Sequence, residues 1–229
     1  MDAPAQPCRL PTRCLAGLIQ GLSALLWVLP VAVVVCVQTA RHIAWQGHGP
    51  WPVVVVTGWL WWTLTRLVRA AEAPQALARS VRRGRLLALM LWGLSPFLHW
   101  HARVPDHPWF SFMTLAAGLT GWLLLIECNR IIPRVVDACP DLAVMHEVNA
   151  FCRLNRALFV SGGILWAGLQ ILSRAMPTWE GMERWPPAWR HVEAPLWMLF
   201  LVTPLALTLV GLWKTRQTLW AELCRRAGD

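Results

Sequence analysis

Residues 14–38, CLAGLIQGLSALLWVLPVAVVVCVQ, contain no Asp, Glu, Lys, Arg or His. A helix of about 20 mostly apolar residues is long enough to cross the hydrocarbon core of a bilayer. The run follows Arg9 and Arg13, as the apolar part of a signal peptide follows basic residues, but it is too long for such a part. It therefore predicts a first transmembrane helix that stays attached to the chain.

Five further apolar segments extend this pattern along the chain. Of the 229 residues, 56% are apolar and 14% are charged, and the mean hydropathy is +0.44. This composition excludes a disordered chain, a coiled coil and a disulfide-stapled secreted domain, and it disfavours a soluble enzyme, because soluble domains are about 25% charged. The expected spans are residues 14–38, 51–68, 86–102, 109–127, 157–174 and 194–213.

The sequence thus predicts an all-α, polytopic integral membrane protein. We expect residues 1–229 to form a single domain of about six transmembrane helices, arranged as three hairpins. The second and third spans are short for a bilayer crossing. Arrangements with four or five spans, in which one of these segments is re-entrant, therefore remain open.

Basic residues fix the expected orientation of the spans. The formal net charge is +9, and 16 of the 21 Lys and Arg residues flank one side of the predicted membrane. Because cytoplasmic loops are enriched in Lys and Arg, both termini should be cytoplasmic, which places the chain in the cell inner membrane. A high positive charge can indicate a nucleic-acid-binding protein. Here the Lys and Arg residues lie in clusters between apolar segments, which is typical of membrane topology instead. The 16 residues are Arg9, Arg13, Arg66, Arg69, Arg79, Arg82, Arg83, Arg85, Arg130, Arg134, Arg153, Arg156, Lys214, Arg216, Arg225 and Arg226.

Two cytoplasmic connections have an amphipathic, helix-favouring composition. They are residues 66–85, interrupted by Pro74, and residues 127–156, which Pro133 and Pro140 are expected to divide. Such segments either lie on the membrane surface or extend the flanking helices into the cytoplasm.

Ionisable side chains are missing from the middle third of every expected span. This disfavours a proton pump, an ion-coupled carrier and a transmembrane diheme cytochrome, because those activities need charged or ligating groups inside the membrane. Gln20 and Gln170 are the notable polar residues, and we expect interhelical hydrogen bonds to satisfy both.

Pairs of small residues four apart indicate where helices pack closely. The pairs are Gly17 with Gly21, Ala117 with Gly121, and Gly163 with Ala167. Without a hydrophobic drive between helices in lipid, such pairs allow close backbone approach. We expect packing within the chain, and contact with another subunit is the alternative.

Histidine and tryptophan gather in the three loops on the outer side. Six of the seven His residues lie there, each loop also contains Trp and Pro, and the chain has 17 Trp and no Tyr. An interfacial aromatic belt explains this composition. The alternative is a cofactor site in which imidazoles bind copper, zinc or heme iron. The candidate ligands are His99, His101 and His107, and the other outer residues are His42, His48 and His191.

A second set of possible ligands lies on the inner side. Cys128, Cys139, His146 and Cys152 carry atoms suited to zinc, but their spacing has no CxxC pair, so inert cysteines are favoured. His146–Glu147 begins an HExxH motif that Ala150 breaks, and no phosphate-binding or hydrolase motif occurs.

The expected function is therefore non-catalytic. We expect an accessory or scaffold subunit of a larger inner-membrane complex, with membrane lipids and other membrane subunits as partners and no cofactor. A redox or cofactor-handling protein with heme, quinone or metal at the outer His/Trp-rich face is the alternative. The third possibility is a small-solute transporter. It is disfavoured because the expected spans lack the charged residues that couple transport to an ion.

Overall fold

Six long helices make up the described structure. It is a computed structural model that describes residues 11–41, 47–70, 75–138, 142–175 and 187–228. Within these residues there is no strand, which confirms the all-α fold class. The helices are α1 (Thr12–Arg41), α2 (Trp51–Ala70), α3 (Gln75–Arg103), α4 (Pro108–Ala138), α5 (Leu142–Ala175) and α6 (Pro187–Gly228).

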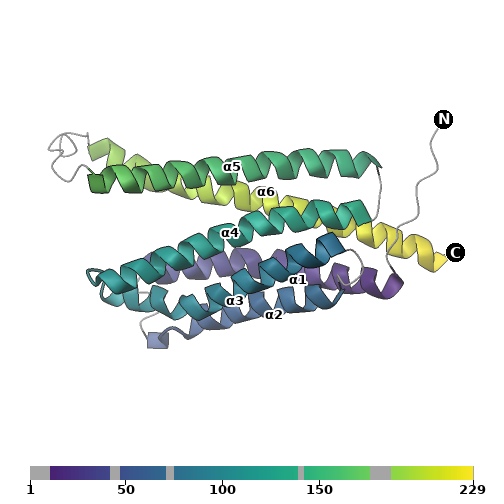
Figure 1. Ribbon diagram of the computed structural model, residues 1–229, viewed down its shortest axis with the longest axis horizontal. Coiled ribbons are helices and arrows are strands. Elements are labelled where there is room, and N and C mark those ends of the chain that lie inside the picture. Colours follow the sequence, from purple (N-terminus) through teal and green to yellow (C-terminus); the bar gives the residue numbers. More distant parts are fainter. Residues whose placement is uncertain (1–10, 42–46, 71–74, 139–141, 176–186, 229) are drawn as a thin grey trace.

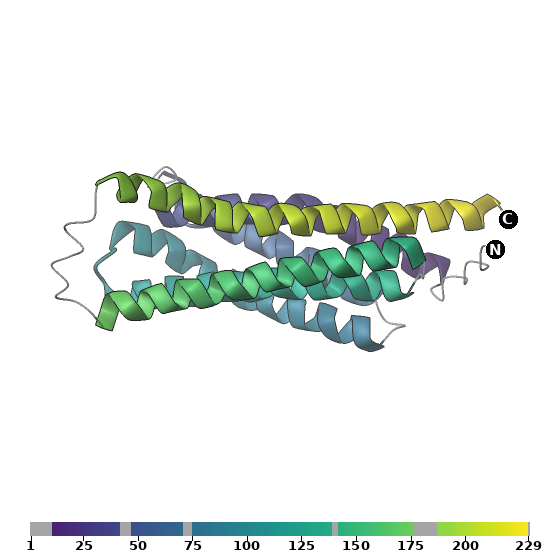
Figure 2. The same ribbon diagram turned by 90° about the horizontal axis from the view of Figure 1, so that it is seen from above.

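Successive helices run in opposite directions along one common axis (Figure 1). α1 to α4 pack as a group, and α5 and α6 lie beside α4 and α1. The first residues of α1 and the last residues of α6 lie at the same end of the bundle, where α6 projects beyond its neighbours (Figure 2). A hydrophobic core, mostly Leu, Ile and Val, runs between the helices.

The helices are longer than the spans expected from the sequence. α6 has 42 residues, or about 63 Å at 1.5 Å per residue, about twice the thickness of the hydrocarbon core. The two amphipathic connections lengthen four other helices, because most of their residues continue the helices on either side. They form residues 66–70 of α2, 75–85 of α3, 127–138 of α4 and 142–156 of α5.

Pro133 does not divide the second connection, and that prediction is wrong. The residue lies inside α4. A proline within a helix removes one backbone donor, here the one that would pair with the carbonyl of Asn129. Neighbouring helices and polar side chains commonly compensate for this loss in membrane helices.

Two helices are long and apolar enough to cross a membrane, judged by length and composition over the described residues. They are Thr12–Ala40, with 29 residues, and Pro108–Asp137, with 30 residues. α2 contains four Trp residues, which lower its hydropathy, and α3 begins with four Arg residues in its first half. The number of six spans therefore remains a prediction.

Glycines bring α1 against α2, as the small-residue pattern predicted. A Cβ added at Gly17 would lie 2.9 Å from the Cβ of Ala70, and one at Gly21 would lie 2.6 Å from Cδ1 of Leu67. At Gly17 and Gly21, α2 is therefore too close for a larger side chain to fit without a shift of its neighbours. In contrast, a Cβ at Gly121 would meet nothing within 4 Å. The first pair thus serves packing within the chain, and the side chain of Ala167 lies outside the described residues.

Candidate functional site: an amide cluster between three helices

Three polar side chains from three helices meet in the core. Asn129 on α4, Asn155 on α5 and Thr208 on α6 are each at most 1% exposed. We call these three residues the amide cluster. They lie close to the cytoplasmic ends of the expected spans 109–127, 157–174 and 194–213.

The members of the amide cluster bond to one another and to nearby backbone carbonyls. Nδ2 of Asn155 lies 2.8 Å from Oδ1 of Asn129, 3.0 Å from Oγ1 of Thr208 and 3.1 Å from the carbonyl of Pro204. Nδ2 of Asn129 donates to Oγ1 of Thr208 at 2.8 Å and to the carbonyl of Leu125 at 2.9 Å. The Thr208 hydroxyl donates to the Pro204 carbonyl at 2.7 Å. Oδ1 of Asn155 is buried without a partner in the described part of the chain.

This arrangement joins α4, α5 and α6 by directional contacts. A buried amide with no partner costs free energy, so each side chain favours the one packing in which its partners are in reach. The cluster therefore fixes the rotation and depth of the three helices relative to one another, which nondirectional contacts specify less sharply.

Sequence reasoning missed these residues because it assigned Asn129 and Asn155 to a cytoplasmic connection, and it did not single out Thr208 in the expected span 194–213. One signal was available. Each polar residue lies three or four positions from apolar residues that are now buried, and this spacing places it on the same helix face. Those apolar residues are Leu125, Ile132, Cys152, Phe159, Leu205 and Leu212.

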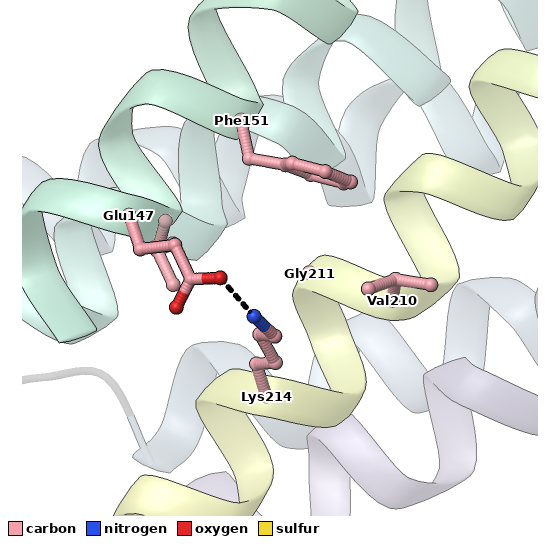
Figure 3. Close-up of a pocket in the computed structure, with 6 residues that line it drawn as sticks. Glu147, Phe151, Val210, Gly211 and Lys214 are labelled. Atoms are coloured by element: carbon pink, nitrogen blue, oxygen red, sulfur yellow. Dashed lines mark hydrogen bonds and ion pairs between the residues drawn. The ribbon is translucent and has the colours of Figure 1, made fainter.

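A small cavity lies one to two turns from the cluster, between α5 and α6 (Figure 3). Glu147 of α5 and Lys214 of α6 point toward each other across it and form an ion pair, with Phe151 near the pair. The cavity holds about 10 Å³, roughly the space that one water molecule needs. It offers charge pairing between two helices but no room for an organic substrate.

Glu127 is the buried carboxylate of the described residues. Its Oε2 lies 3.0 Å from Nη1 of Arg130, and the side chains are 4% and 44% exposed. Its Oε1 is buried without a hydrogen-bond partner in the described part of the chain. Because Arg130 is one turn further along the same helix, this pair neutralises the charge without joining two helices.

Three of the histidines predicted to face outward, His99, His101 and His107, lie within the described residues. His99 is 6% exposed on α3, and His101 is partly buried, with Nδ1 lacking a hydrogen-bond partner among the described residues. His107 is exposed between α3 and α4, with its ring centroid 4.9 Å from that of Phe110. Over the described residues, which include these three, no three His, Cys, Asp or Glu side chains are grouped to hold a metal ion.

The remaining possible ligands are dispersed or outside the described residues. His48 is exposed, whereas His42 and the side chain of His191 lie outside the described residues. Cys128 of α4 and Cys152 of α5, on the side predicted to be cytoplasmic, are buried. Cys139 and the side chain of His146 are not among the described groups.

We expect maleimide to modify Cys224 rapidly and Cys152 very slowly in the folded protein. Cys224 is exposed. Cys152 lies outside the expected span 157–174, and burial raises the pKa of its thiol from 9.0 to about 11, partly opposed by the charge of Arg156. This lowers the reactive thiolate fraction at neutral pH about 100-fold.

Peptide mapping by mass spectrometry after brief labelling at pH 7.5 checks this expectation. Protein denatured in sodium dodecyl sulfate is the control, because both thiols should then react. Equal labelling of Cys152 and Cys224 in the folded protein would show that α5 is not packed as described.

Comparison of the chain with protein families, curated proteins and solved structures finds no match.

Proposed function

We propose that this chain is a multi-pass inner-membrane protein with about six spanning helices and cytoplasmic termini. We further propose that it is a non-catalytic accessory or scaffold subunit of a larger complex, binding lipid and the helices of partner subunits. The distribution of polar and apolar side chains is the observation that carries this proposal.

Large apolar side chains are exposed on every helix. A soluble monomer rarely exposes contiguous apolar patches larger than a few hundred Å², whereas lipid solvates such a surface. The most exposed include Trp27, Trp51, Val55, Trp109, Phe112, Ile164 and Trp220.

Several polar side chains are buried in the otherwise hydrophobic interior. Besides the amide cluster, Thr57 of α2 and Ser95 of α3 are fully buried, with their hydroxyl oxygens 3.2 Å apart. In hydrocarbon, polar groups must find partners inside the protein. Buried, hydrogen-bonded polar groups beneath a surface with many exposed apolar side chains therefore support membrane insertion.

The amide cluster supports a scaffold function over a catalytic one. Catalytic groups need access to a substrate, but these side chains are buried and bonded to one another and to backbone carbonyls. The adjacent cavity of about 10 Å³ leaves no space for an organic substrate. What the cluster supplies is a fixed arrangement of α4, α5 and α6, on whose outer faces partners can dock.

A cofactor-handling function at the outer face is the second candidate. It is favoured by Nδ1 of His101 and Oγ1 of Thr114, two buried atoms without hydrogen-bond partners among the described residues. Absorption spectra and metal analysis of the purified protein test it. A Soret band, or stoichiometric copper or zinc that is lost in a His99→Ala/His101→Ala variant, would replace the scaffold proposal.

Extraction in a mild detergent at native expression level tests the scaffold proposal. We expect the chain to migrate in a larger assembly with other membrane proteins at fixed stoichiometry. A chain that is recovered without any other protein under these conditions would contradict the proposal.

A further inference from the structure

The exposed face of α2 changes from apolar to basic within about one helical turn. Val55, Trp59 and Trp62 are exposed along this face, and the next exposed residues toward the C-terminus are Arg66 and Arg69. The Cζ atom of Arg66 lies 3.8 Å from the centroid of the Trp62 ring. Tryptophan is enriched where hydrocarbon gives way to lipid headgroups, and arginine extends its charged group toward that level. The change on α2 therefore fits the depth of the headgroups.

The exposed face of α3 changes in the same way. Leu86 and Met90 are exposed, whereas the exposed residues before them include Arg79, Arg82 and Arg83. These three arginines lie within about 6 Å along the helix axis at 1.5 Å per residue. Their side chains form no hydrogen bond or ion pair with the described chain. Their guanidinium groups are thus available to a ligand.

The changes on α2 and α3 lie at the same level of the hairpin. The two helices pack against each other in opposite directions, and the hydroxyl oxygens of Thr57 and Ser95 are 3.2 Å apart. Arg69 and Arg83 each lie twelve residues from this contact toward the end where α2 passes into α3, so the two arginines are level with each other. We define the arginine rim as Arg66, Arg69, Arg79, Arg82 and Arg83.

The positive charge of the arginine rim is not balanced by carboxylates of the described chain. Glu127, Glu147 and Glu222 each form an ion pair with a basic residue outside the rim. No ion pair joins a rim arginine to the described residues. Basic residues at the cytoplasmic surface of a membrane attract anionic lipids, and each contributes to the binding free energy.

An anionic phospholipid fits both parts of this surface. Its phosphodiester accepts charge-assisted hydrogen bonds from guanidinium groups, and its acyl chains cover the apolar residues on the membrane side of the rim. A zwitterionic lipid offers the same phosphate, but its ammonium group opposes the charge of the rim. An acidic protein or a nucleic acid pairs with the arginines but leaves the adjoining apolar residues uncovered.

We propose that the arginine rim and the exposed apolar residues beside it, Trp62, Leu86 and Met90, bind an anionic phospholipid of the cytoplasmic leaflet. This inference deepens the lipid binding proposed above and rests on the membrane placement of α2 and α3. It assigns a headgroup preference to the hairpin that these two helices form.

Native mass spectrometry of the full-length protein measures this preference. Delipidated protein in detergent is titrated with dioleoyl phosphatidylglycerol or dioleoyl phosphatidylcholine, which differ only in the headgroup. We expect phosphatidylglycerol to bind about tenfold more tightly, because several arginines contribute. Arg82→Gln/Arg83→Gln should bring the affinities of the two lipids within about threefold of each other.

A matched double variant controls for loss of charge elsewhere. Arg225→Gln/Arg226→Gln removes the same formal charge from the end of α6, where both arginines bond to Glu222. It should leave the preference for phosphatidylglycerol unchanged. Equal affinity of the wild type for the two lipids, or an equal loss of preference in both double variants, overturns the proposal.

Soluble competitors distinguish a lipid from other anions. At constant ionic strength, we expect neither inorganic phosphate nor polyglutamate to displace phosphatidylglycerol, because neither covers the apolar residues. Displacement by phosphate would indicate a site for the free anion, and displacement by polyglutamate would indicate an acidic protein partner, so either result overturns the proposal. Release of the wild-type chain from native membranes by alkaline carbonate instead overturns the membrane placement, which keeps the two failures distinguishable.

Discussion

Replacing Asn155 with alanine is expected to lower the free energy of unfolding by about 2–3 kcal/mol. The substitution removes the amide that lies within hydrogen-bond distance of Asn129, Thr208 and the Pro204 carbonyl. Buried polar groups left without a partner cost about 1–3 kcal/mol. Single interhelical hydrogen bonds in membrane proteins average about 0.6 kcal/mol, so the larger effect reflects the several contacts of Asn155.

The same substitution at Asn149 provides a matched control. This residue lies on α5, is only partly buried and makes no hydrogen bond to the described chain. Asn149→Ala should change the free energy of unfolding by less than about 0.5 kcal/mol. Reversible unfolding in mixed micelles, followed by circular dichroism, measures both variants.

A double-mutant cycle distinguishes the cluster from simple loss of volume. Asn129→Ala and Asn155→Ala should be strongly non-additive, because each removes the same hydrogen bond. Equal effects of Asn149→Ala and Asn155→Ala, or strict additivity in the cycle, would show that the amide cluster does not join the helices.

Gly17→Ala is expected to lower the stability of the fold, whereas Gly118→Ala is not. At Gly17 the new methyl group would lie 2.9 Å from Cβ of Ala70, so α1 and α2 must separate, at a cost of about 1–3 kcal/mol. Alanine is otherwise favoured over glycine in a helix by about 0.5–1 kcal/mol. A Cβ at Gly118 meets nothing within 4 Å, so that variant should be unchanged or slightly stabilised.

Unfolding of the two glycine variants under the conditions used for Asn155 measures this difference. Gly21→Ala is a useful third variant, because the atom that its methyl group meets is Cδ1 of Leu67, the end of a flexible side chain. It should destabilise less than Gly17→Ala. If Gly17→Ala is as stable as Gly118→Ala, the close contact between α1 and α2 is absent.

The expected spans 14–38 and 51–68 match α1 and α2 to within three residues at each end, because long apolar runs have few other stable conformations. The lengths of the other helices were underestimated, since charged residues end a hydropathic span but do not end a helix. Residues 75–85 illustrate this: their four Arg residues are compatible with helix and extend α3 beyond the apolar segment.

The amide cluster was beyond sequence reasoning for a different reason. Asn129 and Asn155 are 26 positions apart, and Thr208 is 53 positions beyond Asn155. Their meeting depends on how three helices pack, which periodicity within one helix does not specify. The metal-binding hypothesis for His99, His101 and His107 rested on proximity in sequence, and it stays a prediction, although no three possible ligands are grouped among the described residues.

Sandwich fusions of reporters test the central claim, that lipid surrounds these helices and that the arginine-rich ends face the cytoplasm. Alkaline phosphatase should be active when inserted at residues 42–46, 104–107 and 176–186. Green fluorescent protein should fluoresce at residues 71–74, 139–141 and the C-terminus. Cytoplasmic placement of residues 176–186 would contradict the predicted orientation. Recovery of the fluorescent fusion in the aqueous fraction, without membrane, would contradict the claim that lipid surrounds the helices.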